Sequence, residues 1–177
     1  MQQIQNGPVQ SGQTLKAHPD MSLKHTKGNL IDLAEAGAFD VIVHGCNCFN
    51  TMGSGIAKEI RERYPMVFAI DSLTESGDIM KLGCWTEVEP STFLIINAYT
   101  QYGYKGATMN VDLFEYTSFQ LILQKLASLH GKKDFGFPYI GMGLAGGDKP
   151  IIMAMLEDFA IQVSAIGGSV TLVEFGK

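Results

Sequence analysis

The chain is poor in cysteine, and its cysteines show no disulfide or metal-binding pattern. There are three, Cys46, Cys48 and Cys84. An odd number without a regular framework argues against a secreted disulfide scaffold. Cys46 and Cys48 are separated by one residue, which is not the spacing of a zinc site, and the sequence has no second pair. Because no cluster of metal-ligating residues is visible, we expect chemistry that needs neither a metal nor a cofactor.

Positive charge and long apolar stretches are also scarce. Thirteen Lys and Arg residues against 18 Asp and Glu residues give a formal net charge of -5. This balance argues against broad binding to nucleic acids or anionic membranes, because such binding relies on Lys and Arg to neutralise phosphates. No run approaches the ~18 apolar residues that span a bilayer, and the N-terminus lacks the apolar core of a signal peptide. We therefore predict a cytoplasmic protein, and by default a monomer, since no pattern indicates a coiled coil.

The remaining composition is that of one globular domain. Hydrophobic residues make up 46% of the 177 residues, which is enough to bury a core. Residues 1–20 are polar and have no periodicity, so we predict a flexible N-terminal leader there. Residues 21–177 are predicted to form the single domain.

Strand and helix signals alternate along that domain. Strands are predicted at residues 23–26, 41–43, 84–88, 93–98, 135–137 and 170–175, and helices at residues 30–36, 55–64, 67–76, 112–129 and 149–166, with Asp112 and Asp148 as N-caps of the last two helices. This alternation predicts an α/β fold, a three-layer α/β/α sandwich with a mixed, mostly parallel central sheet. Ligands of such folds bind at the carboxyl ends of the strands, where the loops gather.

The most informative segment follows the buried strand at 41–43. A polar stretch that contains His44 and Asn47 leads into Gly53-Ser54-Gly55, which opens a helix. Glycines let backbone N–H groups approach an anion, and a helix N-terminus adds unpaired N–H groups with partial positive charge. The segment therefore predicts a phosphate-binding loop beside residues that could do chemistry or orient a ligand.

A second glycine-rich loop lies late in the chain. Residues 141–146 match the pattern G-x-G-x-x-G. A dinucleotide-binding site needs this pattern in the first strand-to-helix turn, with an acidic residue at the end of the next strand. Here the nearest acidic candidates, Glu157 and Asp158, fall within a predicted helix, so a dehydrogenase is rejected. Two glycine loops at two strand ends can instead hold two phosphates, as in the diphosphate of a nucleotide sugar.

Four segments, in the same order and with similar spacing, resemble macro domains across residues 22–177. They are Lys27-Gly28-Asn29-Leu30, His44-Gly45-Cys46-Asn47, Gly53-Ser54-Gly55-Ile56-Ala57, and the stretch from Phe137 to Leu144. The resemblance is greatest to the branch that hydrolyses ADP-ribose 1″-phosphate to ADP-ribose and phosphate, a phosphatase reaction. It implies a small-molecule ADP-ribose derivative as partner.

Two other functions within the family remain open. One is a non-catalytic reader of ADP-ribose. The other is a hydrolase that removes ADP-ribose from modified protein or nucleic acid, and that branch relies on a Lys just after the strand predicted at 93–98. This chain has Thr100-Gln101-Tyr102 there, and its nearest lysine is Lys105. Since Gln cannot form the lysine adduct, this departure ranks the hydrolase behind the phosphatase.

The resemblance assigns roles to individual residues. His44 is the candidate for proton transfer or for donation to the phosphate, or else it bonds only to the backbone. Asp148 would orient or deprotonate the water, with helix capping as the alternative. Asn47 would hold the distal ribose or a phosphate oxygen. The catalytic candidates are therefore His44, Asn47 and Asp148.

The remaining candidates are expected to bind the ligand. Asn29 would recognise the adenine amino group, backbone N–H groups of both loops would bind the phosphates, and Phe175 would either stack on adenine or pack in the core. The full set of predicted ligand-binding residues is Asn29, Leu30, Gly53, Ser54, Gly55, Ile56, Gly141, Met142, Gly143, Leu144, Ala145, Gly146 and Phe175.

Overall fold

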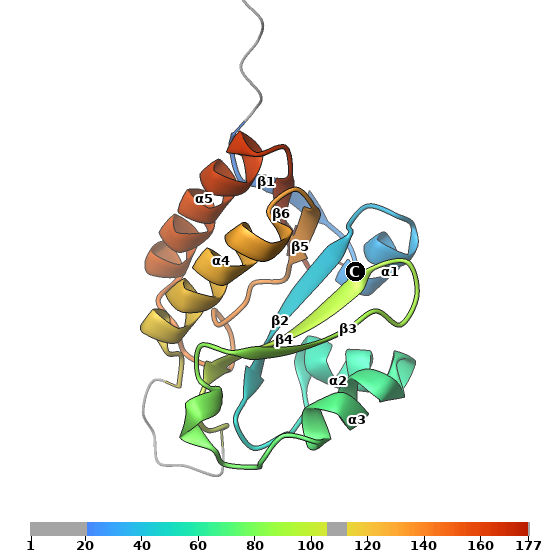
Figure 1. The fold of residues 1–177 in the computed structure, drawn as a ribbon, viewed down its shortest axis with the longest axis vertical. Coiled ribbons are helices and arrows are strands. Elements are labelled where there is room, and N and C mark those ends of the chain that lie inside the picture. Colours follow the sequence, from blue (N-terminus) through green and yellow to red (C-terminus); the bar gives the residue numbers. More distant parts are fainter. Residues whose placement is uncertain (1–20, 106–112, 177) are drawn as a thin grey trace, which may run out of the picture.

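The structure, a computed structural model, describes residues 21–105 and 113–176. The leader predicted at residues 1–20 and the helix N-cap predicted at Asp112 lie outside these ranges. Among the described residues, six strands form one sheet in the order β1-β6-β5-β2-β4-β3 (Figure 1). All neighbouring pairs are parallel except β3 and β4, which are antiparallel. The strands are β1 (Lys24–Lys27), β2 (Val41–Asn47), β3 (Trp85–Val88), β4 (Leu94–Gln101), β5 (Asp134–Phe137) and β6 (Ser169–Glu174).

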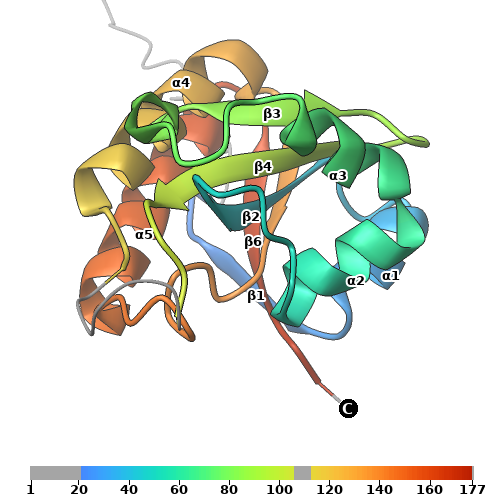
Figure 2. The ribbon, with the colours of Figure 1, turned by 90° about the horizontal axis from the view of Figure 1, so that it is seen from below.

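Helices cover both faces of this sheet. On one face lie α1 (Leu30–Glu35), α2 (Gly55–Arg63) and α3 (Pro65–Ser72), and on the other lie α4 (Tyr116–His130) and α5 (Lys149–Ala165). Figure 2 shows the sheet edge-on between the two helical layers. A short 3₁₀ helix, η1 (Ile79–Lys81), precedes β3. The predicted three-layer α/β/α sandwich with a mixed, mostly parallel sheet is confirmed.

Several boundaries differ from the prediction, and two of these differences have a clear physical reason. The helix predicted from residue 112 begins at Tyr116, because Phe114 forms an antiparallel bridge with Gln101 and the Glu115 N–H donates to the Thr100 carbonyl. These bonds hold residues 113–115 extended beside β4. The strand predicted at 41–43 continues to Asn47, since β2 stays paired with β4 along its whole length.

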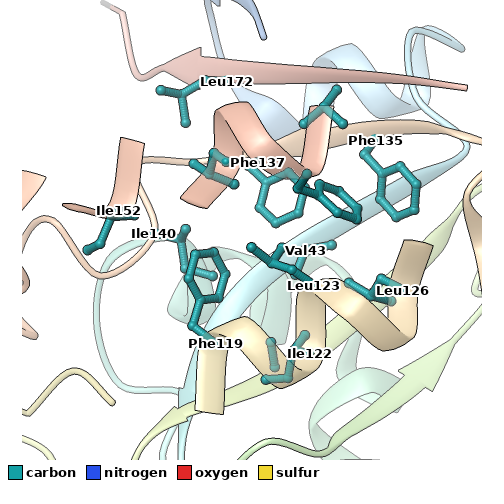
Figure 3. Packing of buried hydrophobic residues seen from close by; sticks show 14 of the residues in the cluster. Val43, Phe119, Ile122, Leu123, Leu126, Phe135, Phe137, Ile140, Ile152 and Leu172 are labelled. Atoms are coloured by element: carbon teal, nitrogen blue, oxygen red, sulfur yellow. The ribbon is translucent and has the colours of Figure 1, made fainter. Parts of the chain in front are cut away.

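The face under α4 and α5 holds an aromatic core. The rings of Phe135 and Phe137 on β5 both pack edge-on against Phe159 of α5, with centroid separations of 5.1 and 5.8 Å. Figure 3 shows the β5 rings beside Val43 of β2 and the aliphatic side chains of α4. Buried residues of α5 recur at helical spacing, namely Ile152, Leu156, Phe159, Ala160 and Val163. This layer contains most of the apolar core, and the cavities described below lie in the loops beyond the strand ends.

We predict that Phe159→Ala lowers the free energy of unfolding by about 3–5 kcal/mol, because the substitution removes a fully buried ring and leaves a cavity. Urea unfolding monitored by circular dichroism measures the change. The matched control is Ile161→Ala on the same helix, where the side chain is 47% exposed and the expected change is within about 0.5 kcal/mol. Equal losses in the two variants would contradict this account of the core.

Candidate functional site

The candidate site lies at one edge of the sheet. Because β2, β4, β5 and β6 are parallel, their carboxyl ends point the same way, and the segments that follow them gather there. The first loop (residues 48–54) follows β2, and the second loop (residues 138–148) follows β5. β2 and β5 are direct neighbours in the sheet, so the two loops start side by side although they lie far apart in the sequence.

Both glycine loops line one cavity of about 680 Å³, called the large cavity below. The first loop and the start of α2 contribute Thr51, Gly53, Ser54, Gly55, Ile56 and Ala57. The second loop contributes Pro138, Tyr139, Ile140, Gly141, Gly143, Leu144 and Ala145. Gly45 and Asn47 at the end of β2, together with Gln101, Tyr104 and Lys105 after β4, complete the lining.

A second cavity of about 450 Å³, the small cavity, adjoins the first. The two share Gly55, Ile56 and Pro138, so they form neighbouring parts of one depression. The rest of the small cavity is lined by Gly28, Asn29, Leu30, Glu59, Val173 and Phe175. Segments after β1, β5 and β6 and the first turns of α1 and α2 therefore contribute to it.

Backbone N–H groups without a hydrogen-bond partner among the described residues occur in both loops that line the large cavity. Helix α2 starts at Gly55, and the N-cap Ser54 makes no side-chain capping bond. Within the described ranges, no group accepts a hydrogen bond from the N–H of Gly55, Ile56 or Ala57, nor from those of residues 143–145 in the second loop. Such N–H groups, with the partial positive charge of a helix N-terminus, suit an anion.

Two glycines are required by the geometry of this edge. A Cβ on Gly45 would lie 2.9 Å from Thr100 Oγ1 and 3.3 Å from Ile140. Gly141 has a φ of +74°, and a Cβ there would lie 2.3 Å from the Phe114 ring. A side chain at Gly45 would displace Thr100 or Ile140, and one at Gly141 would displace the Phe114 ring.

The structure places His44 away from both cavities, and no contact supports its predicted role towards phosphate. Successive residues of a strand point to opposite faces, so the cavity receives Gly45 while the His44 ring points into the core under α2 and α3. The ring is fully buried, and its Nε2 donates to Asn97 Oδ1 over 2.6 Å. Burial lowers the pKa of His44 to about 4, although the hydrogen bond with Asn97 opposes this change. His44 is thus a neutral core residue near pH 7.

Asp148 also lies outside both cavities. It is the N-cap of α5, and its Oδ1 accepts from the Ile151 N–H over 3.1 Å. Its backbone N–H donates to the Tyr116 hydroxyl, which ties the end of the second loop to α4. Asp148 thus acts as a helix cap, and no contact supports the predicted role in positioning water.

Asn47 lines the large cavity, but its side chain already has partners in the first loop. Its Nδ2 donates to the Thr51 hydroxyl over 2.7 Å and to the Thr51 carbonyl over 3.1 Å, and its Oδ1 accepts from the Phe49 N–H. Asn47 therefore shapes the loop that carries the cavity's N–H groups.

Most of the remaining predicted ligand-binding residues line one or both of the cavities. Met142 and Gly146 of the second loop line neither cavity. Phe175 is 70% exposed beside the small cavity, so the core-packing alternative for this ring is wrong. Asn29 lies at the small cavity as the N-cap of α1.

Sequence reasoning missed several residues that the structure brings to the cavities. Gln101 and Lys105 were considered only as departures from the hydrolase pattern, yet both line the large cavity. Glu59 was not considered, although it lies three and four residues after Ile56 and Gly55, on the same helical face. That spacing was the signal that could have identified it.

A buried polar network supports the first loop from the interior side of the protein. The Lys81 ammonium donates to the Cys48 carbonyl over 3.1 Å and to Asn50 Oδ1, and it lies 4.5 Å from the centroid of the Tyr99 ring. The Tyr99 hydroxyl donates to Asp71 over 2.6 Å. Burial raises the pKa of Asp71, which the Tyr99 hydrogen bond and the Lys81 charge partly offset. Through these bonds, the loop backbone is held in place from the interior of the protein.

Neither a membrane-spanning helix nor a metal site is present in the part of the chain that the structure describes. None of its helices combines the length and apolar character required to cross a bilayer. No group of three or more His, Cys, Asp or Glu side chains there is placed to hold a metal ion.

Proteins with related sequences include one from a bacteriophage. The chain is 31% identical over 155 residues to an uncharacterised 17.5 kDa protein from the tk-vs intergenic region of Enterobacteria phage T4, a match that covers 82% of this chain and 95% of the phage protein. A stretch of 49 residues is 37% identical to an ADP-ribose 1″-phosphate phosphatase of Aspergillus oryzae, covering 28% of this chain and 23% of the fungal protein. No family model matches the chain.

Solved structures with similar folds cover nearly the whole described chain. A Bacteroides thetaiotaomicron protein has a TM-score of 0.72 at 21% identity, over 86% of this chain and 99% of its own. The macrodomain of Thermus aquaticus DarG has a TM-score of 0.62 at 14% identity, over 88% and 98%. Thermosipho africanus DarTG, solved in complex with ADP-ribose, has a TM-score of 0.64 at 12% identity, over 89% of this chain and 43% of its own. At these identities the similarity concerns the fold.

The burial of His44 predicts a pH dependence of stability. Its folded pKa of about 4 lies below the usual 6.5, so between these values the unfolded chain takes up a proton that the folded chain does not. Folding stability contributed by the neutral ring is present above pH 6.5 and is lost as the pH falls towards 4, by roughly 3 kcal/mol in total.

We therefore expect His44→Gln to lose less stability than the wild type between pH 7 and pH 4.5 in urea unfolding. Carboxyl groups such as Asp71 titrate in both proteins and cancel in the comparison. His25→Gln makes the same substitution at an exposed position of β1 and serves as the control. Parallel profiles for wild type and His44→Gln would show that the ring does not titrate in this way.

Proposed function

The chain is a macrodomain by fold and belongs to the same family as the 17.5 kDa protein of phage T4, and we propose that it binds ADP-ribose derivatives and hydrolyses the bond to a substituent on the distal ribose. The observation that carries the proposal is the pair of adjoining cavities between the two glycine loops. Support also comes from the ADP-ribose bound by Thermosipho africanus DarTG, a protein of similar fold.

The two cavities differ in charge, and the difference orients the ligand. Among its described lining residues the large cavity has Lys105 and no carboxylate, together with the N–H groups of both loops. The small cavity has the Glu59 carboxylate and the exposed Phe175 ring, but no cation in its lining. A diphosphate is therefore favoured in the large cavity, and an uncharged aromatic base in the small one.

This orientation places the distal ribose in the large cavity, towards Asn47 and Lys105. The first candidate substituent is a phosphate at the 1″ position, so that the protein acts as an ADP-ribose 1″-phosphate phosphatase. In this reaction water attacks phosphorus, the bond from phosphorus to the ribose oxygen breaks, and ADP-ribose and phosphate form. The 49-residue match to a fungal phosphatase supports this choice.

The cavity's contribution to that reaction would be positioning and charge stabilisation. N–H groups and the Lys105 ammonium can stabilise charge on the phosphoryl oxygens. Neither His44 nor Asp148 reaches the cavity, so no step is assigned to them.

A second candidate is removal of ADP-ribose from a modified protein or nucleic acid. The observation that favours it is Lys105, an exposed residue after β4 that lines the large cavity. A lysine amine can attack the sugar carbon itself, so that the bond from this carbon to the modified glutamate or thymidine breaks and a covalent adduct forms. Water then hydrolyses the adduct, which releases ADP-ribose and frees the lysine. Gln101 cannot form such an adduct, so the presence of Lys105 in the large cavity is what supports ADP-ribose removal as a second candidate.

We predict that Gly53→Asp weakens ADP-ribose binding roughly 100-fold or more, because a carboxylate would lie against the diphosphate. A Cβ at Gly53 meets no atom within 4 Å, so the fold tolerates the side chain. Isothermal titration calorimetry measures the affinity, and thermal unfolding shows that the variant is folded. The control Gly53→Ala adds no charge and should bind within about tenfold of wild type. Equal binding by Gly53→Asp and wild type would place the diphosphate elsewhere.

Substitutions of Lys105 separate the two reactions. If the lysine only stabilises charge on a phosphate, Lys105→Arg keeps most of the phosphate release from ADP-ribose 1″-phosphate, whereas Lys105→Ala loses about 10²-fold or more. If the lysine forms an adduct, both variants lose the release of ADP-ribose from modified glutamate or thymidine.

The control for these assays is Asp148→Asn, which preserves the helix cap and should leave turnover unchanged in either reaction. A wild-type protein that binds ADP-ribose but turns over none of these substrates would contradict the hydrolysis and leave a reader of ADP-ribose.

A further inference from the structure

We propose that Glu59, and not Asn29, selects the base of the bound nucleotide, and that it favours a base with an exocyclic amino group. This inference rests on the proposed function, because it assumes that the base occupies the small cavity. The resemblance to macro domains assigns adenine recognition to Asn29, and this proposal assigns it to Glu59 instead.

Asn29 has no acceptor to spare for a ligand. Its Oδ1 accepts from the N–H groups of Ile31 and Asp32, over 2.8 and 3.3 Å, and so caps α1. Its Nδ2 donates to Glu59 Oε1 over 2.7 Å. Rotating the amide by 180° would set its oxygen against the carboxylate and its NH₂ against the helix N–H groups, so the observed orientation is the one that satisfies both ends. Asn29 therefore contributes to the small cavity indirectly, because its Nδ2 holds the Glu59 carboxylate in place.

Glu59 combines a position at the cavity with an available oxygen. It lines the small cavity, and its side chain is 33% exposed. One carboxylate oxygen, Oε1, accepts from Asn29 and from the Arg63 guanidinium, at 2.7 and 3.1 Å. For the other oxygen, Oε2, the described residues provide no hydrogen-bond donor. An ionised carboxylate only accepts hydrogen bonds, so this oxygen selects for a donor on the ligand.

The surrounding charges strengthen that selection. Arg63 pairs with three carboxylates, those of Asp32, Glu35 and Glu59, at 2.7, 2.6 and 3.1 Å. Its pKa is raised, most by the hydrogen bond with Asp32, and the one cation leaves a surplus of negative charge at this side of the small cavity. A base with an amino group is attracted there, whereas a carbonyl oxygen at the same position is repelled. Adenine has the amino group, and hypoxanthine has a carbonyl in its place.

The inference is tested with ADP-ribose and inosine diphosphate ribose, two ligands that differ at one edge of the base. The adenine amino group is replaced by a carbonyl, and the neighbouring N1 gains a proton. Calorimetry on the wild-type chain should show about tenfold or more weaker binding of the inosine compound, because its carbonyl oxygen stands at the position from which the adenine amino group donates to the Glu59 oxygen. In Glu59→Gln, an amide NH₂ can replace the free oxygen and donate to the carbonyl. The preference for adenine should then fall to near one or reverse.

The matched control is Glu62→Gln on the same helix. Glu62 is exposed, pairs only with Lys58 across 3.8 Å among the described residues, and lines neither cavity. This variant loses the same charge and should keep the wild-type preference. A preference that falls equally in both variants would reflect net charge and would overturn the role of Glu59.

The outcomes also separate this inference from the function on which it rests. Wild-type protein that binds both nucleotides equally well overturns base selection by Glu59 while ADP-ribose binding stands. Folded wild-type protein that binds neither compound removes the proposed function itself. Because the wild-type ratio needs no variant, the test holds even if thermal unfolding shows that Glu59→Gln is misfolded.

Discussion

The parallel pairing of β2 with both β4 and β5 is the constraint on which the rest of the structure depends. Parallel strands deliver their carboxyl ends to one edge, so the three segments that follow them must meet there. Two of those segments are the glycine loops, and the third carries Gln101 and Lys105. The strands themselves are held by the aromatic core under α4 and α5, whose rings Phe135, Phe137 and Phe159 line neither cavity.

The other helical layer provides polar support for the site. Lys81 and Tyr99 fix the first loop from the interior, and Arg63 joins α1 to α2 around the small cavity. Each of these side chains is partly or fully buried and satisfied by several partners, which is how a buried polar group contributes order without a large desolvation cost. The cavity walls are consequently positioned before a ligand arrives, and less ordering is needed on binding.

Much of this architecture was predictable from local patterns. The β-branched run at 41–43, the apolar spacing of α5 and the positions of Gly53 and Gly141 identify strands, helices and loops, because each signal depends on neighbours close in the sequence. The order of the glycine segments also indicated that two loops share one ligand. The start of α4 was mispredicted, since an unforeseen bridge between Phe114 and Gln101 keeps the chain extended there.

By itself, the sequence determined the layers, the two glycine loops and the residue types available at their ends. Only the tertiary structure decided which of those side chains face the cavities. Because β2 continues past residue 43, its alternation of side chains buries His44 and presents Gly45 to the large cavity. At the small cavity, the Asn29 side chain is bonded to Glu59 and within α1, and Glu59 lines the cavity. Side-chain direction depends on pairing and packing between distant segments, and such contacts leave no mark in a single local pattern.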